Sequence, residues 1–255
     1  MWSIGNLKMK TMYLKITGSS SSGNNYILDS GSEILLIESG VTLKKVKESI
    51  DFDLSKVIGC ICSHYHSDHF KFAPDYMKAG IDMYSSKETL ELSGIDHHRA
   101  HIMEPKKTYQ IGSFRVMGFM MPHGDIESMG FIIKHGSNKI LFVTDCHYVP
   151  YKFSGLTNLL IEANHDIEIV DHKLLEGNGN VFVRDRSLSA HMELQTAKAF
   201  LKANDLSAVN NIVLIHLSDS GSDEKRFVKE IAAQTGKTTY AAKAGLEIDF
   251  GITPF

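Results

Sequence analysis

The sequence predicts an α/β fold in which two β-sheets are covered by helices within one domain. Strand-like segments dominate the first half of the chain and helices alternate with strands in the second half, which together favour this arrangement. The composition is that of an ordinary globular protein, with 43% hydrophobic and 22% charged residues among 255. No repeat, low-complexity block or proline-rich linker divides the chain, so residues 1–255 are expected to form a single domain.

Residues 12–79 are predicted to hold four strands and two helices. Short runs of β-branched and aromatic residues, bounded by Gly and Ser, indicate the strands. A helix is predicted over Val41–Ile50, where apolar residues recur at helical spacing with lysines between them, and another over Phe70–Ala79. The strands are Met12–Thr17, Tyr26–Asp29, Ile34–Glu38 and the wholly apolar Val57–Cys62.

From Phe114 onwards, six further strands and three helices are predicted. The predicted strands are Phe114–Met121, Met129–Lys134, Lys139–Thr144, Asn158–Ile161, Asn211–Ile215 and Gly245–Phe250. The predicted helices are Ile167–Leu175, Leu194–Ala203 and Asp223–Gln234. Helices placed between strands in this way are expected to cover the faces of the sheets.

Charge and composition exclude several classes of protein. The 27 Lys and Arg against 30 Asp and Glu give a formal charge of −3, which argues against a strongly basic nucleic-acid coat protein. This net charge is still compatible with a local basic groove. No apolar stretch reaches the ~18 residues of a membrane span, and Met1–Lys10 lacks an apolar signal segment. Three cysteines fit a reducing compartment. We therefore expect a cytoplasmic protein without a membrane partner, and a homo-oligomer is compatible with the sequence.

Ligand-type side chains are concentrated directly after the apolar strand Val57–Cys62. The segment there is His64-Tyr65-His66-Ser67-Asp68-His69, in a chain with 13 histidines. His64 and His66 point the same way in extended backbone, and Asp68 and His69 follow as the chain turns towards a helix. Four such side chains can serve two metal ions: imidazole suits Zn, Fe, Ni or Cu, and the carboxylate widens the choice to Mn. The alternative is a solvated polar loop.

This H-x-H-x-D-H segment resembles the motif of the metallo-β-lactamase superfamily, and the resemblance extends over nearly the whole chain. Three further residues match in the family's order, each where an apolar run ends. They are His123 in Met121-Pro122-His123, Asp145 after Ile140–Thr144, and His216 after Ile212–Ile215. The resemblance implies a four-layer αββα sandwich, in which two mixed β-sheets are flanked by helices.

The same resemblance implies two divalent metal ions, zinc or manganese before iron or nickel. One ion would be held by His64, His66 and His123. The other would be held by Asp68, His69 and His216, with Asp145 bridging the two. Two cations need carboxylates to offset their charge, and a water between them becomes a hydroxide near neutral pH.

Within the superfamily the chain looks like the YycJ/WalJ-like group, which is similar to tRNase Z and the cyclic phosphodiesterases. The matching segments are Gly18–Asn24, Glu162–Asp166, Ser189–His191 and His216–Ser218. Proteins of this group hydrolyse phosphodiesters with metal ions, and WalJ-like proteins are regarded as 5′-to-3′ DNA exonucleases. The resemblance therefore implies a phosphodiesterase or nuclease acting on nucleic acid or another phosphodiester.

His191 resembles the additional histidine of tRNase Z-type enzymes, with Glu162 supporting it. Phosphodiester cleavage needs a proton for the leaving alkoxide, and a histidine held protonated by a carboxylate can supply it. Asp68, His191 and Glu162 are therefore the candidate catalytic residues. The alternative for His191 is a surface residue that precedes the helix Leu194–Ala203.

Other histidines and several cations are left with open roles. His165 either lies in the cleft or belongs to a turn before a helix that Asp166 caps. His97, His98 and His101 fit a substrate-facing insert or a solvated helix better than a metal site. His147 stands where the family has a small residue. Candidate contacts to a polyanion are Lys71, Arg184, Arg186, Lys225 and Arg226.

Two other functions remain open from the sequence alone. The same scaffold supports two-metal hydrolysis of a small ester, thioester, lactone or cyclic phosphodiester. A metal-binding accessory of DNA processing without turnover is the third possibility. The sequence decides neither the metal nor between DNA and RNA.

Overall fold

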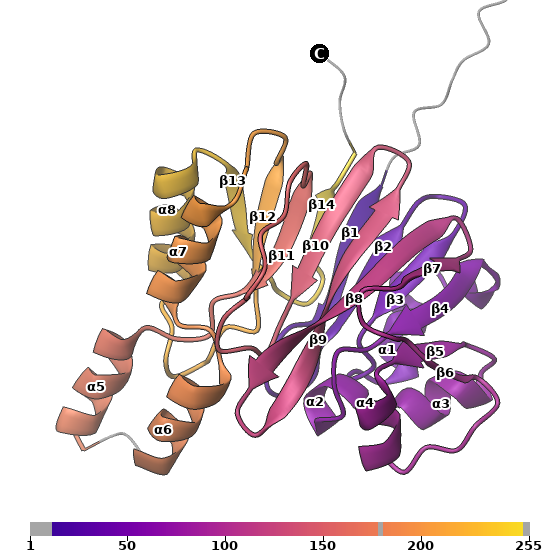
Figure 1. Cartoon of the computed structure of the whole chain (residues 1–255), viewed down its shortest axis with the longest axis horizontal. Helices are drawn as coiled ribbons and strands as arrows, with labels where there is room; N and C mark the ends of the chain where they lie inside the picture. Colours follow the sequence, from indigo (N-terminus) through magenta and orange to yellow (C-terminus); the bar gives the residue numbers. More distant parts are fainter. Residues whose placement is uncertain (1–11, 178–180, 252–255) are drawn as a thin grey trace, which may run out of the picture.

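The computed structural model describes residues 12–177 and 181–251, which form two seven-stranded sheets packed face to face (Figure 1). In spatial order the first sheet contains β14 (Glu247–Asp249), β1 (Tyr13–Gly18), β2 (Asn25–Asp29), β3 (Ile34–Ile37), β4 (Val57–Ile61), β5 (Met83–Ser85) and β6 (Ala100–Ile102). The second contains β13 (Thr238–Ala241), β12 (Asn211–Ile215), β11 (Asn158–Glu162), β10 (Asn138–Val143), β9 (Ile126–His135), β8 (Phe114–His123) and β7 (Thr108–Ile111).

Each sheet combines antiparallel and parallel pairing. In the first sheet β14, β1, β2 and β3 pair antiparallel, and β3 to β6 pair parallel. In the second sheet β7 to β10 pair antiparallel, and β10 to β13 pair parallel. The carboxyl ends of parallel strands meet at one edge, so the loops after β10, β11 and β12 lie side by side there.

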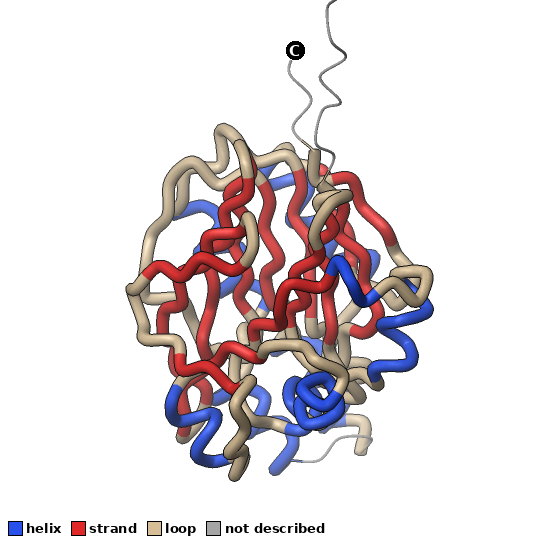
Figure 2. The backbone as a smooth tube through the Cα atoms, turned by 90° about the vertical axis from the view of Figure 1, so that its right-hand side faces the viewer, coloured by secondary structure: helices blue, strands red, loops and turns tan. Residues whose placement is uncertain are grey.

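Helices cover the outer side of both sheets. The first sheet carries α1 (Leu43–Ser49), α2 (Ser67–Phe70), α3 (Ala73–Lys78) and α4 (Lys87–Leu92), with a 3₁₀ turn at Leu54–Lys56. The second sheet carries α7 (Leu194–Ala203) and α8 (Glu224–Thr235), and α5 (Ile167–Leu175) and α6 (Val181–Ala190) lie beyond its edge, at the lower left of Figure 1. Figure 2 shows the strands at the centre of the molecule and most helices around them. The predicted four-layer αββα sandwich with two mixed sheets is confirmed. None of the helices in the described residues is long and apolar enough to cross a membrane.

Apolar side chains fill the three spaces between the layers. Between the sheets, the rings of Tyr26 and Phe142 meet edge to face with centroids 5.4 Å apart. Tyr76 of α3 is buried against the first sheet, and Phe227 of α8 against the second. The three cysteines are free and buried, as expected of small apolar residues in a core.

Sequence reasoning found the long central strands and the short edge strand β14, but it missed four other short strands. The strands β5, β6, β7 and β13 have three or four residues each, too few for a periodic pattern to emerge. The helix predicted over Phe70–Ala79 corresponds to α3, which begins only at Ala73 with Pro74 in its first turn, and Phe70 is instead the last residue of the separate helix α2. The helices α4 and α6 were not predicted.

Gly40 lets two loops at the metal-motif edge pack directly against each other. A Cβ at Gly40 would lie 1.7 Å from the backbone oxygen of Asp68, far inside van der Waals contact. The same oxygen accepts a hydrogen bond of 2.7 Å from the backbone N–H of Asn24. Only glycine fits at this position, because the atom that blocks a side chain belongs to the backbone.

We expect Gly40→Ala to destabilise the fold at or above the ~1–3 kcal/mol typical of overpacking. Gly31→Ala is the control: its Cβ would meet no atom within 4 Å, but its φ of +82° carries a backbone cost of ~1–2 kcal/mol. Denaturant unfolding of both variants measures the difference. A Gly40→Ala protein as stable as the Gly31→Ala protein would contradict this packing account.

Candidate metal centre

The seven predicted metal-binding residues lie together at one edge of the two sheets. They come from loops and strand ends that are far apart in sequence but share this edge. His64, His66, Asp68 and His69 follow β4, His123 ends β8, Asp145 follows β10 and His216 follows β12. Two groups of four side chains result, and Asp145 belongs to both.

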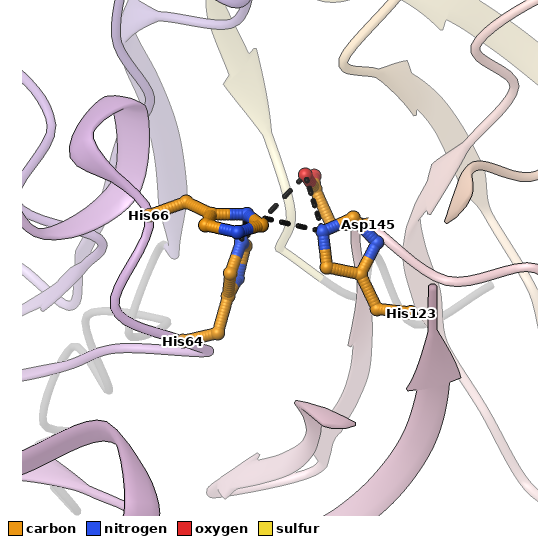
Figure 3. A group of neighbouring side chains, drawn as sticks. All are labelled: His64, His66, His123 and Asp145. Carbon is orange, nitrogen blue, oxygen red and sulfur yellow. Dashed lines mark hydrogen bonds and ion pairs between the residues drawn. The ribbon is translucent and has the colours of Figure 1, made fainter. Parts of the chain in front are cut away.

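The first group is formed by His64, His66, His123 and Asp145, whose side chains point towards one another (Figure 3). His66 Nδ1 lies 2.9 Å from His64 Nε2 and 3.2 Å from His123 Nε2. Imidazole nitrogens that share a tetrahedral metal ion at ~2.0–2.1 Å lie ~3.3 Å apart. The spacing of these three nitrogens is therefore close to that of a metal site.

The second group is formed by Asp68, His69, Asp145 and His216. His69 Nε2 lies 3.1 Å from Asp68 Oδ2 and 3.2 Å from Asp145 Oδ1. His216 Nε2 lies 3.1 Å from Asp68 Oδ2. Asp145 thus directs Oδ1 to this group, and its Oδ2 lies 3.8 Å and 3.7 Å from the nearest nitrogens of His64 and His123. One carboxylate faces both groups.

Glu162 and His191, the other two candidate catalytic residues, form a pair beside these groups. Glu162 Oε1 accepts a hydrogen bond of 2.7 Å from His191 Nδ1. The second oxygen of Glu162 accepts bonds of 3.0 Å and 3.1 Å from the backbone N–H groups of Cys146 and Met192. The carboxylate is completely buried and both of its oxygens accept hydrogen bonds, so it fixes the ring of His191. Together with Asp145 and His216, this pair makes a third group that could hold a metal ion.

Residues that sequence reasoning missed hold these side chains in place. The backbone oxygen of Ala190 accepts a hydrogen bond of 2.7 Å from His123 Nδ1, which leaves Nε2 free to face the first group. Asn164 donates a bond of 2.8 Å to the backbone oxygen of His216. Glu38 is buried under His69, with Oε1 3.5 Å from Nδ1. The sequence did offer a signal for Glu38, because a carboxylate that directly follows the wholly apolar strand β3 is a candidate site residue.

The backbone is strained at three of these positions. Glu38, Asp145 and His216 have φ angles of 66°, 45° and 53°, in the left-handed region that non-glycine residues rarely adopt. Such residues persist only where the surrounding structure enforces them, and they concentrate at functional sites. Here each follows a buried strand and turns its side chain into the site.

Protonation differs between the first two groups. Burial, reinforced by neighbouring histidines, lowers the pKa of His64 and of His123 and brings that of His66 to about 4, so these rings are neutral at pH 7. Burial also opposes protonation of His216, but the carboxylates of Asp145 and Asp68 raise its pKa to about 10. The pKa of His69 is raised for the same reason.

The donor set fits two divalent metal ions. Neutral imidazoles with converging nitrogens are ready ligands in the first group, and in the second a cation would replace the protons now held between histidine and carboxylate. The Nδ1 atom of His69 is buried without a hydrogen-bond partner. Five imidazoles and two carboxylates suit Zn or other first-row metals better than Mg or Ca. The clusters are consistent with a dinuclear metal site.

An open cleft of about 540 Å³ lies over these groups. Its lining is mainly polar and includes Asp68, Asp145, His191 and His216. Ser21 of the Gly/Ser loop borders it on one side and the segment Leu217–Ser220 on another. A substrate in this cleft would therefore contact the metal groups and His191 together.

The remaining histidines lie outside this arrangement. His165 is buried, and both its ring nitrogens lack a hydrogen-bond partner among the described residues. It does not line the cleft, and Asp166 caps α5, so the turn interpretation of this segment holds. His147 is exposed beside Tyr148. Of the two expectations for His97–His101, the solvated helix is wrong, because the segment leads into β6, and the substrate-facing insert stays a prediction. None of these histidines joins a potential metal group in the described structure.

Two of the five cations expected near the cleft form ion pairs with carboxylates. Arg184 pairs with Asp171 at 2.8 Å, and Arg226 pairs with Asp166 at 2.6 Å. Lys71 and Lys225 are exposed. The side chain of Arg186 lies outside the described part of the structure.

Comparison with known proteins places the chain in a family. A family model described as the Beta-lactamase superfamily domain matches residues 29–217. Exodeoxyribonuclease WalJ of Streptococcus pneumoniae is 26% identical, over 93% of this chain and 91% of the relative. Two solved structures share the fold. The metallo-β-lactamase fold protein YhfI from Bacillus subtilis has a TM-score of 0.73 at 17% identity, covering 94% of this chain and 99% of that chain. Zn²⁺-bound PqqB from Methylobacterium extorquens has a TM-score of 0.69 at 13% identity, covering 93% and 100%.

These matches agree with the motif and the fold. The segment covered by the family model includes all three clusters of ligand-type side chains. The resemblance to the YycJ/WalJ-like group is confirmed as a distant relationship. The chain belongs to the metallo-β-lactamase superfamily.

Proposed function

We propose that this protein is a two-metal phosphodiesterase that degrades nucleic acid, most simply as a 5′-to-3′ DNA exonuclease. The observation that carries the proposal is the hydrogen bond between buried Glu162 and His191, whose ring lines the open cleft together with Asp145. The relationship to exodeoxyribonuclease WalJ over most of both chains supports the choice of DNA. We propose Zn or Mn as the metal, in line with the donor set and the zinc-bound relative PqqB.

The reaction needs a nucleophile, charge neutralisation and a proton for the leaving group. Two divalent ions, when bound, neutralise the phosphodiester oxygens and lower the pKa of the attacking water. The protein's part is to hold Asp145 between the two groups and Asp68 against His69 and His216. These carboxylates offset the positive charge, so that the cleft attracts a phosphodiester without binding it too tightly to release.

His191 is the proposed proton donor to the leaving alkoxide. Its Nδ1 is bound to Glu162, which leaves Nε2 as the atom available to a substrate in the cleft. Burial lowers the pKa of His191, but the Glu162 carboxylate outweighs this and raises the pKa above the ordinary value. The upward shift of the pKa favours the protonated ring, the form that a general acid needs before substrate arrives.

A second candidate is hydrolysis of a small uncharged ester, thioester or lactone. The neutralised state of Arg184 and Arg226 favours it, because the cleft offers a polyanion few free cations. An activity screen with DNA, RNA, a lactone and a thioester decides between the candidates. Intact nucleic acid in the presence of Mn or Zn, together with rapid turnover of a lactone or thioester, would favour the second candidate.

We expect the purified protein to bind about two divalent ions per chain and Asp145→Ala to reduce the affinity of both. His123→Ala should weaken one ion more than the other, since its side chain belongs to a single group. Elemental analysis and metal titration measure this, with the exposed Asp125→Ala as the control carboxylate. A protein that binds no transition metal would contradict the metal assignment.

We expect His191→Ala to keep its metals but lose ~10²–10⁴-fold in DNA cleavage, the usual contribution of a positioned acid. Glu162→Gln should show a smaller loss. Bis-p-nitrophenyl phosphate should be much less affected, because p-nitrophenolate leaves without needing a proton.

The exposed His172→Ala serves as the control for this experiment. Equal losses on DNA and on bis-p-nitrophenyl phosphate, accompanied by loss of metal, would make His191 a ligand in the third group. Unchanged DNA cleavage would remove His191 from the mechanism.

A further inference from the structure

Three cations lie side by side across the outer face of the second sheet. Arg115 of β8 is directly opposite Lys134 of β9, and Lys134 is directly opposite Lys139 of β10. Figure 1 shows these three strands adjacent in the sheet. Arg115 and Lys134 are exposed, and Lys139 is half-buried. We call Arg115, Lys134 and Lys139 the cation row.

The cation row is electrostatically unfavourable as it stands. Like charges directly opposite each other across strands destabilise a sheet. In the described residues no carboxylate forms an ion pair with any of the three, and Lys139 instead donates to the backbone oxygen of Ser154 at 2.5 Å. Burial and the charge of Lys134 lower the pKa of Lys139. An anion bound here would remove the repulsion.

A small pocket lies at the cation row. It has a volume of about 200 Å³ and is lined by the three cations together with Thr108, Met117, Ile132 and Phe153. One wall is therefore cationic and the other apolar and aromatic. This volume is below the ~300–1,000 Å³ that encloses a free small ligand, so the pocket suits one unit of a longer polyanion.

The cation row lies at the opposite end of β8 from the metal groups. Eight residues separate Arg115 from His123 on this strand, which corresponds to ~27 Å at ~3.4 Å per residue. A stacked nucleic-acid strand advances ~3.4 Å per nucleotide, so roughly eight nucleotides would span this distance. A polyanion long enough could occupy both places at once.

From the repulsion, the pocket and this spacing we infer that the cation row is a docking site for the phosphate backbone of substrate nucleic acid. The inference rests on the proposed nuclease function. It explains how a chain with a net charge of −3, whose cleft arginines are paired, can attract a polyanion. The row holds the part of the strand that is not being cleaved, and its charge carries no base specificity.

The test compares Arg115→Gln/Lys134→Gln with Lys202→Gln/Lys229→Gln, a control on exposed lysines of α7 and α8. Cleavage is measured on a 40-nucleotide DNA, a 4-nucleotide DNA and bis-p-nitrophenyl phosphate at several salt concentrations. For the long DNA, the slope of log(kcat/KM) against log salt should fall by roughly 1.4 in the first variant, at ~0.7 per lost phosphate contact. Cleavage of the two short substrates by this variant should be unchanged, and so should the salt slope of the Lys202→Gln/Lys229→Gln control. The melting temperature of the Arg115→Gln/Lys134→Gln protein should equal or exceed that of the wild type, since a repulsion is removed.

Binding of the labelled 40-nucleotide DNA in EDTA separates this inference from the proposed function. Weaker binding by the Arg115→Gln/Lys134→Gln protein alone supports the docking site, even if the wild type cleaves no DNA and the proposed function fails. Equal binding by both variants, or an unchanged salt slope in an active enzyme, overturns the docking site and leaves the function standing. Displacement of the DNA by millimolar inorganic phosphate at constant ionic strength would also overturn it, by assigning the row to free phosphate.

Discussion

The site depends on one carboxylate that faces two groups of histidines. Asp145 directs Oδ1 towards His69 and Oδ2 towards His64 and His123. A buried charge of this kind is unfavourable unless it is paired. Thr144 donates a hydrogen bond of 2.8 Å to Asp145 Oδ1, and the ionisable partners of the carboxylate are imidazoles that can exchange a proton for a metal ion. The left-handed backbone at Asp145 is the local strain that this placement requires.

The sheets make that placement possible. The parallel strands β10, β11 and β12 end at one edge, where they present Asp145, Glu162 and His216 in spatial order. The first sheet brings the histidine motif to the same edge from β4. Buried Glu38 lies under the ring of His69, and buried Asn164 donates to the backbone oxygen of His216, so the site is supported by a polar layer within an otherwise apolar core. The site residues therefore lie together because the strands that carry them all end at the same edge of the sheets.

Sequence reasoning recovered the fold class, the central strands and the grouping of ligand-type side chains, because all three leave strong local signals. The H-x-H-x-D-H segment is dense, and His123, Asp145 and His216 each follow an apolar run. The supporting residues could not be found in this way: Ala190 acts through a backbone oxygen, and the left-handed turns appear only in three dimensions. The pairing of Arg184 with Asp171, which offsets the charge of a predicted substrate contact, likewise depends on how α5 and α6 meet.

The most direct measurement of the central claim is anomalous diffraction from crystals of the protein loaded with zinc or manganese. The account predicts two peaks ~3.5–4 Å apart, one on each side of the Asp145 carboxylate, with each of its oxygens within bonding distance of a different ion. A single peak, or two peaks that do not share Asp145, would contradict it.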